Sequence, residues 1–273
     1  MPTQFEKAET FAALHKREVA FIIPNPWDIG TTKILSQLGF EAIATTSAGY
    51  AFSVGKPDGA IGRDEMMAHV KQIVDATELP VSADLENGFG DDPASVAETV
   101  RLAGDAGLAG CSIEDSFSHS PDGIYDFGLA VERVQAAVEA AHNLPFPFTL
   151  TARAENFLVG RPDMDDTIKR LTAFQEAGAD VLYAPGLSTS EDIASVVKSV
   201  DCPINVLVGL QGMRLSAADL SALGVKRISI GSALSRAALG EFLRASREII
   251  ETGTFNFAGD AVPFAEITGF MTE

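Results

Sequence analysis

A short pattern recurs four times along this chain and constrains its fold more than any other feature. In each copy an amphipathic helical stretch ends, a glycine follows, and an apolar, strand-like run begins. Glycine readily adopts the left-handed conformation that closes many helices, so each copy marks a junction from helix to strand. A chain built from such junctions is typical of a parallel sheet covered by helices. The four glycines are Gly39, Gly107, Gly178 and Gly224.

The whole sequence supplies eight strand candidates separated by helical patterns. The candidates are apolar runs rather than alternating ones, as expected when both faces of a sheet are covered. Eight units within 273 residues favour a (β/α)₈ barrel of the TIM type over a doubly wound sheet. The candidates span residues 19–24, 42–46, 81–86, 110–114, 148–153, 181–184, 204–208 and 227–230.

We expect one domain over residues 1–273, with an N-terminal helix within 1–18 and a C-terminal tail at 252–273. The tail lies beyond the eight units and carries four phenylalanines, and exposed aromatic side chains at this density would favour aggregation. The tail therefore packs either on its own barrel or on a partner subunit, and the sequence leaves both open.

Composition narrows the partners and the compartment. The formal net charge of −18 argues against nucleic acid and against an anionic membrane as partners, because both require basic patches. The chain has no apolar run of membrane-spanning length and no secretory signal pattern. Two cysteines, Cys111 and Cys202, are too few for a secreted disulfide framework, so we expect a cytoplasmic protein.

Acidic side chains stand at the ends of the third and fourth strand candidates. In a barrel the catalytic groups lie at the carboxyl ends of the strands. Asp84 and Glu86 are two residues apart, so on a strand they would point to the same face. Glu114 and Asp115 end the next strand, although they could also form a helix-capping turn. Converging carboxylates suit a hard cation such as Mg²⁺.

Arg153 ends the fifth strand candidate and offers a fixed positive charge on the same rim. A chain this acidic needs a local cation to bind an anionic substrate, and a guanidinium can hold a carboxylate with two hydrogen bonds. The hydroxyl-rich turn at 45–47 would add further donors. Arg153 could also form a structural ion pair with Glu114 or Glu155, in addition to any binding role.

Several of these segments together resemble the isocitrate lyase/phosphoenolpyruvate mutase superfamily, over nearly the whole chain. The matching motifs are Asp-Leu-Glu-Asn-Gly-Phe-Gly at 84–90, Ile-Glu-Asp at 113–115, Thr-Ala-Arg at 151–153, Thr-Thr-Ser at 45–47 and the loop Val-Gly-Lys-Pro-Asp-Gly at 54–59.

The resemblance implies a (β/α)₈ barrel that assembles as a homotetramer in which neighbours exchange their last helix. It also implies a Mg²⁺ ion, or Mn²⁺ in its place. The metal would lie among Asp84, Glu86 and Glu114, with Asp84 as the direct ligand and the other two acting mainly through water.

The resemblance further implies a small 2-oxo or 2-hydroxy carboxylate as the substrate. Its carboxylate would contact Arg153 and the turn of Thr46, Ser47 and Ala48, and Asp58 would lie nearby on a mobile loop. The shared chemistry makes or breaks a bond at carbon 3 of a pyruvate-like unit. The negative charge that develops on an enolate oxygen would be stabilised by a metal and an arginine.

The loop at 116–125 departs from the family's patterns, because it lacks the cysteine of isocitrate lyases and the Lys-Thr-Asn of phosphonomutases. His119 and Tyr125 remain as candidate acids. The resulting hypothesis is a Mg²⁺-dependent lyase that acts by decarboxylation or retro-aldol cleavage through a pyruvate-enolate-like intermediate. The alternatives are a phosphoenolpyruvate or phosphonopyruvate mutase or hydrolase, and a non-catalytic 2-oxo-acid-binding protein.

Overall fold

The structure, a computed structural model, describes residues 2–117, 123–210 and 212–272. In this part of the chain eight parallel strands form one sheet in the order β1-β8-β7-β6-β5-β4-β3-β2. The cylinder closes where Ala44, in β2, donates a backbone hydrogen bond to Pro24, just after β1 (3.0 Å). The predicted barrel is therefore confirmed, and every predicted strand overlaps an observed one. The strands are β1 Phe21–Ile23, β2 Ile43–Ala44, β3 Val81–Asp84, β4 Gly110–Glu114, β5 Thr149–Arg153, β6 Val181–Tyr183, β7 Ile204–Leu207 and β8 Arg227–Ser229.

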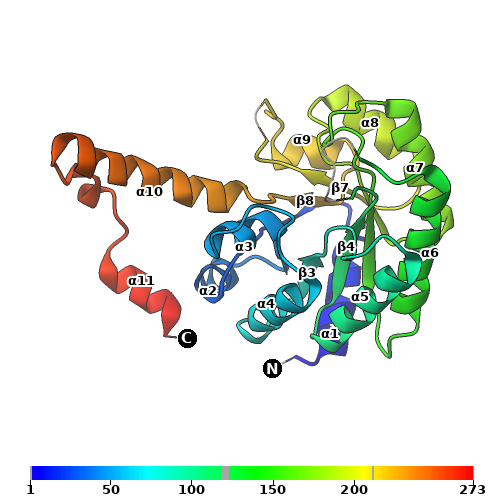
Figure 1. The fold of residues 1–273 in the computed structure, drawn as a ribbon, viewed down its shortest axis with the longest axis horizontal. Helices are drawn as coiled ribbons and strands as arrows, with labels where there is room; N and C mark the ends of the chain where they lie inside the picture. The colour runs from blue at the N-terminus through cyan, green and yellow to red at the C-terminus, as the bar shows by residue number, and fades with distance from the viewer. Residues whose placement is uncertain (1, 118–122, 211, 273) are drawn as a thin grey trace.

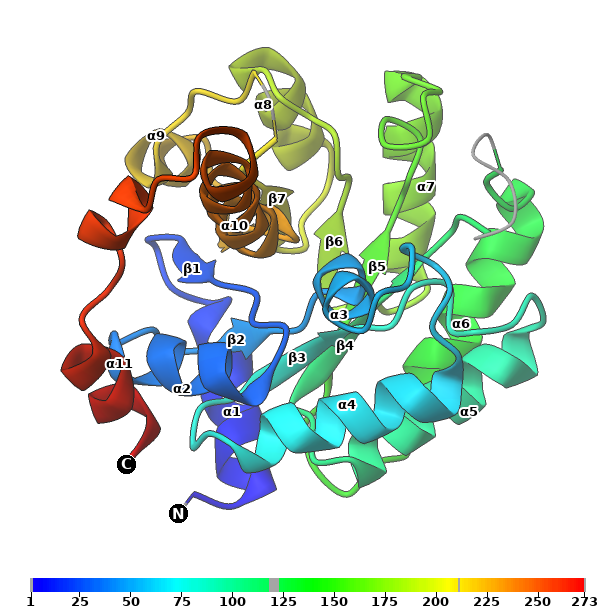
Figure 2. The same ribbon diagram turned by 60° about the vertical axis from the view of Figure 1, so that its left-hand side comes forward.

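Helices surround the strands on the outside of the barrel (Figures 1 and 2). The four predicted junction glycines all have left-handed backbone conformations, with φ between +90° and +101°. Each lets the chain leave a helix and enter the next strand within a few residues. The helices are α1 Gln4–Leu14, α2 Ile29–Gln37, α3 Ser47–Ser53, α4 Arg63–Asp75, α5 Pro93–Asp105, α6 Phe127–His142, α7 Met164–Glu176, α8 Ser190–Ser199, α9 Ala217–Ala222, α10 Ala233–Thr252 and α11 Phe264–Met271, with a 3₁₀ turn at Asn256–Gly259.

Helix α1 closes the amino-terminal end of the barrel. Its buried side chains Ala8, Phe11 and Leu14 pack against Phe21 and Ile23 of β1 in a compact apolar cluster. With that end closed by apolar packing, a ligand can enter only from the carboxyl ends of the strands. Among the described residues no helix is both long enough and apolar enough to cross a membrane.

The carboxyl-terminal part of the chain leaves the barrel. Helix α10 extends away from it, and α11 turns back toward α2 (Figure 1). The contact with α2 includes hydrogen bonds from Lys33 Nζ to the Met271 carbonyl (2.9 Å) and from Gln37 Nε2 to the Phe270 carbonyl (3.0 Å). Large apolar side chains nevertheless stay exposed on this arm, namely Leu239, Phe242, Leu243, Ile249, Ile250, Phe255, Val262, Phe264 and Ile267.

This exposed arm predicts self-association, because a helix with so much free apolar surface requires a partner. We expect the wild-type chain to sediment as an oligomer and Phe242→Arg, at a side chain 67% exposed on α10, to shift it toward monomer. The matched control is Val19→Arg, which adds the same charge at a 68% exposed apolar residue outside the arm. A wild-type protein that is monomeric by analytical ultracentrifugation would refute the exchanged-helix prediction.

Candidate active site

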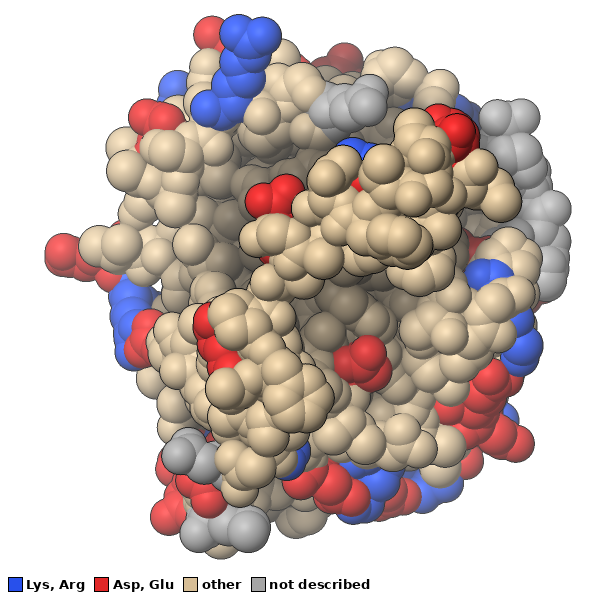
Figure 3. Space-filling view, turned by 90° about the vertical axis from the view of Figure 1, so that its left-hand side faces the viewer, with Lys and Arg blue, Asp and Glu red and all other residues tan. Residues whose placement is uncertain are grey.

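The carboxyl ends of the strands surround a cavity of about 430 Å³. The space-filling view shows the hollow on this face, with acidic side chains visible in it (Figure 3). Eight of the nine predicted site residues line the cavity; the ninth, His119, lies outside the described residues. The eight are Thr46, Ser47, Ala48, Asp58, Asp84, Glu86, Glu114 and Arg153.

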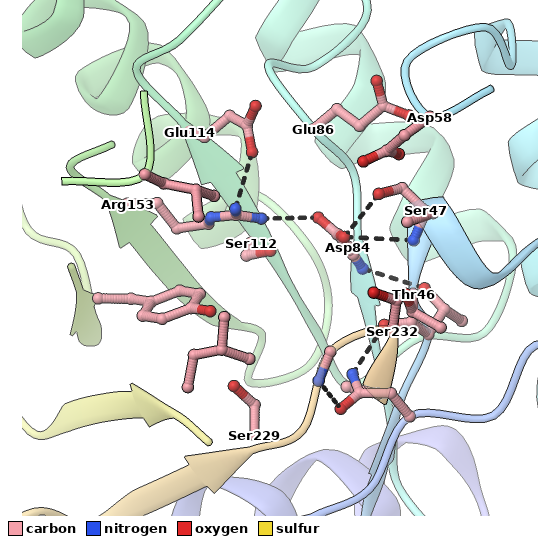
Figure 4. Close-up of a pocket in the computed structure, with 18 of the residues that line it drawn as sticks. Thr46, Ser47, Asp58, Asp84, Glu86, Ser112, Glu114, Arg153, Ser229 and Ser232 are labelled. Carbon is pink, nitrogen blue, oxygen red and sulfur yellow. Dashed lines mark hydrogen bonds and ion pairs between the residues drawn. The ribbon is translucent and has the colours of Figure 1, made fainter. Parts of the chain in front are cut away.

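Arg153 forms the centre of the site (Figure 4). Its guanidinium pairs through Nη1 with Asp84 Oδ1 (2.9 Å), through Nη2 with Glu114 Oε2 (3.1 Å) and through Nε with Glu155 Oε1 (2.8 Å). Burial opposes the charge, but the three carboxylates together raise the pKa of Arg153 well above its ordinary value. Arg153 is therefore both the structural ion-pair residue and the fixed cation that the sequence indicated.

Asp84 is fixed in place by the turn that follows β2. Its Oδ2 accepts hydrogen bonds from the Ser47 backbone N–H (3.2 Å) and the Ser47 hydroxyl (2.9 Å). Its own backbone N–H donates to Thr45 Oγ1 (3.0 Å). The turn continues into α3, whose Ser47 N–H is the one that donates to Asp84 and whose Gly49 N–H donates to the hydroxyl of Thr46. Ser47 thus joins the predicted carboxylate-binding turn to the predicted metal ligand.

Glu86 reaches the cavity by a different route from the one the sequence indicated. We expected it on the third strand, but β3 ends at Asp84 and Glu86 has a left-handed backbone with φ +49°. A tight turn, closed by the Gly88 N–H and the Leu85 carbonyl (2.8 Å), replaces the strand there. The shared-face argument from strand alternation is therefore wrong for this residue, although Glu86 does line the same cavity as Asp84.

The acidic group suits a divalent cation. Burial, followed by the nearby charges of Asp84, Glu114 and Asp58, raises the pKa of Glu86 to about 8. Its Oε1 is buried and has no hydrogen-bond partner. Burial and the charge of Asp84 likewise raise the pKa of Asp58. Carboxylates that repel each other, one with a free oxygen, can be stabilised by a hard cation.

The same carboxylates do not form a compact direct coordination shell. No group of three His, Cys, Asp or Glu side chains in the described part of the chain stands close enough to hold a metal ion directly. Asp84 is also shared between Arg153 and Ser47. A cation here would therefore need water among its ligands, as is usual for Mg²⁺.

Two candidate residues from the sequence, Asp115 and Tyr125, make structural hydrogen bonds and do not line the cavity. Asp115 accepts from the Glu155 backbone N–H (2.8 Å) and from Arg170 Nη1 (3.0 Å), so it links β4 to β5 and α7. The Tyr125 hydroxyl donates to Asp91 Oδ1 (2.7 Å), and Tyr125 does not line the cavity. Tyr125 is therefore a poor candidate for the general acid.

The sequence reasoning missed several residues that line the cavity wall. Asn25, directly after β1, donates to the Thr45 carbonyl (3.0 Å) and accepts from the backbone N–H groups of Ile230 and Gly231 (2.9 Å each). It thereby joins the loops after β1, β2 and β8. Other missed lining residues lie inside the strands. A polar residue within an apolar strand, two residues from another one on the same face, could have indicated them in the sequence. They are Ser112, Tyr183, Arg227 and Ser229.

A second arginine supports the loop that carries Glu86. Arg133, on α6 and 1% exposed, donates to the carbonyls of Asn87 and Gly90 and lies 4.1 Å over the Tyr125 ring. Asn87 in turn donates to the Tyr125 hydroxyl (2.9 Å). This network holds a turn whose left-handed residues would otherwise relax, so it fixes the direction of Glu86.

Removing the guanidinium should therefore be costly. We expect Arg133→Met to lower the free energy of unfolding by about 3 kcal/mol, because buried carbonyls lose a charged donor. Tyr125→Phe should cost less, about 1 kcal/mol, since it removes only the hydroxyl. Arg101→Met, at an exposed arginine on α5, is the control and should change stability by less than about 0.5 kcal/mol. Urea denaturation measures all three, and equal effects at Arg133 and Arg101 would contradict the proposed support.

Comparison with known proteins identifies the family of this chain. The phosphoenolpyruvate phosphomutase family matches residues 11–250. An uncharacterized protein of Mycobacterium tuberculosis is 31% identical over 97% of this chain and 96% of its own length. The 2,3-dimethylmalate lyase of Eubacterium barkeri is 30% identical over 74% of this chain and 72% of its own length.

Among solved structures, one from Burkholderia cenocepacia J2315, assigned as a lyase/mutase, is 58% identical with a TM-score of 0.96. It covers 99% of this chain, which in turn covers 97% of it. The family match and these relatives bear out the resemblance seen in the motifs. The chain belongs to the phosphoenolpyruvate phosphomutase family, and thereby to the isocitrate lyase/phosphoenolpyruvate mutase superfamily of enzymes, which includes carbon–carbon lyases.

Proposed function

We propose that this protein is a Mg²⁺-dependent carbon–carbon lyase that acts on a small 2-oxo or 2-hydroxy carboxylate. One observation carries the proposal: Asp84 joins Arg153 to the donor-rich turn at Ser47, and the other acidic side chains line the same cavity. The cationic fork fits a carboxylate, and the acids fit a metal that a 2-oxo or 2-hydroxy group could chelate. Mn²⁺ would serve the same ligands.

The side chains suggest how the reaction would proceed. Arg153 and the backbone N–H of Ala48, in the first turn of α3, would orient the substrate carboxylate. Asp84, with Glu86 and Glu114 through water, would hold the metal, and a bound metal would supply positive charge that stabilises an oxyanion of the substrate. Arg153 remains charged throughout, so it can stabilise an enolate oxygen as negative charge develops in a pyruvate-like product. Asp58 would lie beside the reacting group as a catalytic residue.

We propose His119 as the general acid. His119 lies outside the described residues, yet it is the one side chain of the loop at 116–125 whose ordinary pKa is near neutrality. We expect His119→Gln to lower turnover at least about tenfold without changing Mg²⁺ affinity, since a positioned acid contributes to the chemical step alone. Steady-state kinetics with calorimetry of Mg²⁺ binding measure the two quantities. Turnover equal to wild type would leave His119 as a solvated loop residue.

Two other functions compete with this proposal. A phosphonate or phosphoenolpyruvate mutase or hydrolase is favoured by the family match itself, and a binding protein without turnover would keep the same site. A panel of 2-oxo acids, 2-hydroxy acids and phosphonates, assayed with Mg²⁺ for CO₂, aldehyde or keto-acid products and phosphate, separates the three. Carbon–carbon cleavage supports the lyase, phosphate release supports the hydrolase, and tight binding without product supports the binding protein. Because the loop at 116–125 lacks the cysteine of isocitrate lyases, we expect isocitrate and methylisocitrate not to be cleaved, and efficient glyoxylate release from isocitrate would contradict this.

A further inference from the structure

Tyr183, at the end of β6, stands beside Arg153 in the cavity. It is among the lining residues and is 7% exposed. It pairs in register with Arg153 on the neighbouring strand β5, and the guanidinium carbon lies 5.1 Å from the centre of the Tyr183 ring. The Tyr183 carbonyl also accepts from the Ala154 backbone N–H (2.9 Å), which ties the end of β5 to β6. Both side chains are thus held together on one part of the cavity wall.

Hydrogen bonds behind Tyr183 determine where its hydroxyl proton can point. Asn205, on β7 and 1% exposed, donates through Nδ2 to Ser229 Oγ on β8 (3.0 Å), so the Ser229 proton is left for the Tyr183 oxygen. Burial raises the pKa of Tyr183, while the charge of Arg153 and the hydrogen bond from Ser229 oppose the shift. The phenol therefore keeps its proton near neutral pH. Each hydroxyl accepts from the residue behind it, so the proton of Tyr183 is free to be donated into the cavity.

Arg153 has few donors left for a substrate. Each of its three guanidinium nitrogens already meets a carboxylate, from Asp84, Glu114 and Glu155. Only the second hydrogens of the two terminal nitrogens remain for a further acceptor. Three carboxylates also outweigh one guanidinium charge, so an incoming carboxylate is bound better if neutral donors add to the arginine. The Tyr183 hydroxyl is such a donor on the adjacent strand.

The part of the cavity near Tyr183 is separate from the acids proposed to surround the metal. Figure 4 shows Arg153 and Ser229 apart from Glu86 and Asp58. A donor on this side can contact a substrate carboxylate without entering the proposed coordination sphere of the metal. Loss of that donor should therefore change the affinity for a carboxylate and leave the affinity for Mg²⁺ unchanged.

We propose that the Tyr183 hydroxyl donates a hydrogen bond to the substrate carboxylate that Arg153 binds, and that Asn205 and Ser229 are positioning residues for this hydroxyl. The inference rests on the proposed function, because that function places the carboxylate at Arg153. The ring packs against the guanidinium and the hydroxyl supplies the donor. The two contributions can therefore be tested separately.

Tyr183→Phe isolates the hydroxyl, because it keeps the ring beside Arg153. With Mg²⁺ present, we expect this variant to bind oxalate at least about fivefold more weakly than the wild type by calorimetry, since a hydrogen bond to a charged acceptor is lost. Its affinity for Mg²⁺ alone should stay within about twofold of the wild type, because no proposed metal ligand changes. The matched control is Tyr50→Phe, at a ring that stacks on His69 and does not line the cavity, and it should leave oxalate affinity unchanged.

Ser229→Ala tests the hydrogen bonds behind Tyr183. It should weaken oxalate binding at least about twofold, but less than Tyr183→Phe does, because the phenol keeps its proton and loses the group that directs it. In the Tyr183→Phe background, Ser229→Ala should have no further effect on oxalate affinity, because it acts only through the lost hydroxyl. A direct or purely structural role of Ser229 would add the same effect in both backgrounds and would contradict the positioning role.

The outcomes separate this inference from the proposed function. Tyr183→Phe with wild-type affinity for oxalate would overturn the role of Tyr183 and leave the proposed function intact. If Tyr183→Phe fails to fold, unchanged oxalate affinity in Ser229→Ala overturns the same role. Wild-type protein that binds no oxalate, with or without Mg²⁺, would instead contradict the proposed function itself.

Discussion

Asp84→Ala should abolish Mg²⁺ binding and turnover while the barrel stays folded. Mutation of a residue that only orients a metal ligand usually lowers metal affinity by about 10–100-fold. Loss of the direct ligand itself should therefore lower Mg²⁺ affinity by at least about 100-fold. Stability should change by less than about 2 kcal/mol, because two effects oppose each other. Arg153 loses one partner but keeps Glu114 and Glu155, and the repulsion of Glu86 by Asp84 disappears.

Calorimetry of Mg²⁺ binding together with thermal denaturation tests this prediction. The control is Asp105→Ala, which removes the same charge from an exposed carboxylate that pairs with Arg101 on the surface. Unchanged Mg²⁺ affinity in Asp84→Ala would refute the metal site, because the proposal makes Asp84 the direct ligand.

Arg153→Lys should weaken binding of oxalate, a mimic of the pyruvate enolate, at least about tenfold although the charge is kept. The guanidinium reaches three carboxylates at 2.8–3.1 Å through three different nitrogens, and one ammonium cannot reproduce that geometry. The free energy of unfolding should also fall by about 1–3 kcal/mol, because at least one buried carboxylate would lose its partner.

The matched control for stability is Arg170→Lys. Arg170 is as buried as Arg153 and pairs with two carboxylates where Arg153 pairs with three, but it does not line the cavity. Arg170→Lys should lower the free energy of unfolding about as much as Arg153→Lys does and leave the affinity for oxalate unchanged. If both variants bind oxalate like the wild type, Arg153 is an ion-pair residue only, and the substrate carboxylate binds elsewhere.

The barrel and most of the site can be predicted from the sequence, because the patterns that indicate them are local. The glycine junctions at Gly39 and Gly178 require only that a helix end and a strand begin, so they predict the barrel without any long-range contact. In a parallel barrel all strands end on one face, so residues that end strands must meet there. That rule was enough to predict that Asp84, Glu114 and Arg153 lie near one another, and the three residues line one cavity in the structure.

Other features depend on contacts between residues far apart in the chain, and only the tertiary structure decided them. Glu86 leaves the strand because a turn supported by Arg133 from α6 takes over at Asp84. Arg227 looks like an ordinary strand residue in the sequence, and only the fold shows that its guanidinium is buried, donates to Thr151 and has no ion pair with any of the described acidic residues. Helix and strand types follow from local backbone preference and the polarity pattern. The balance of a buried charge follows from which side chains the fold brings near it, and no local pattern encodes that.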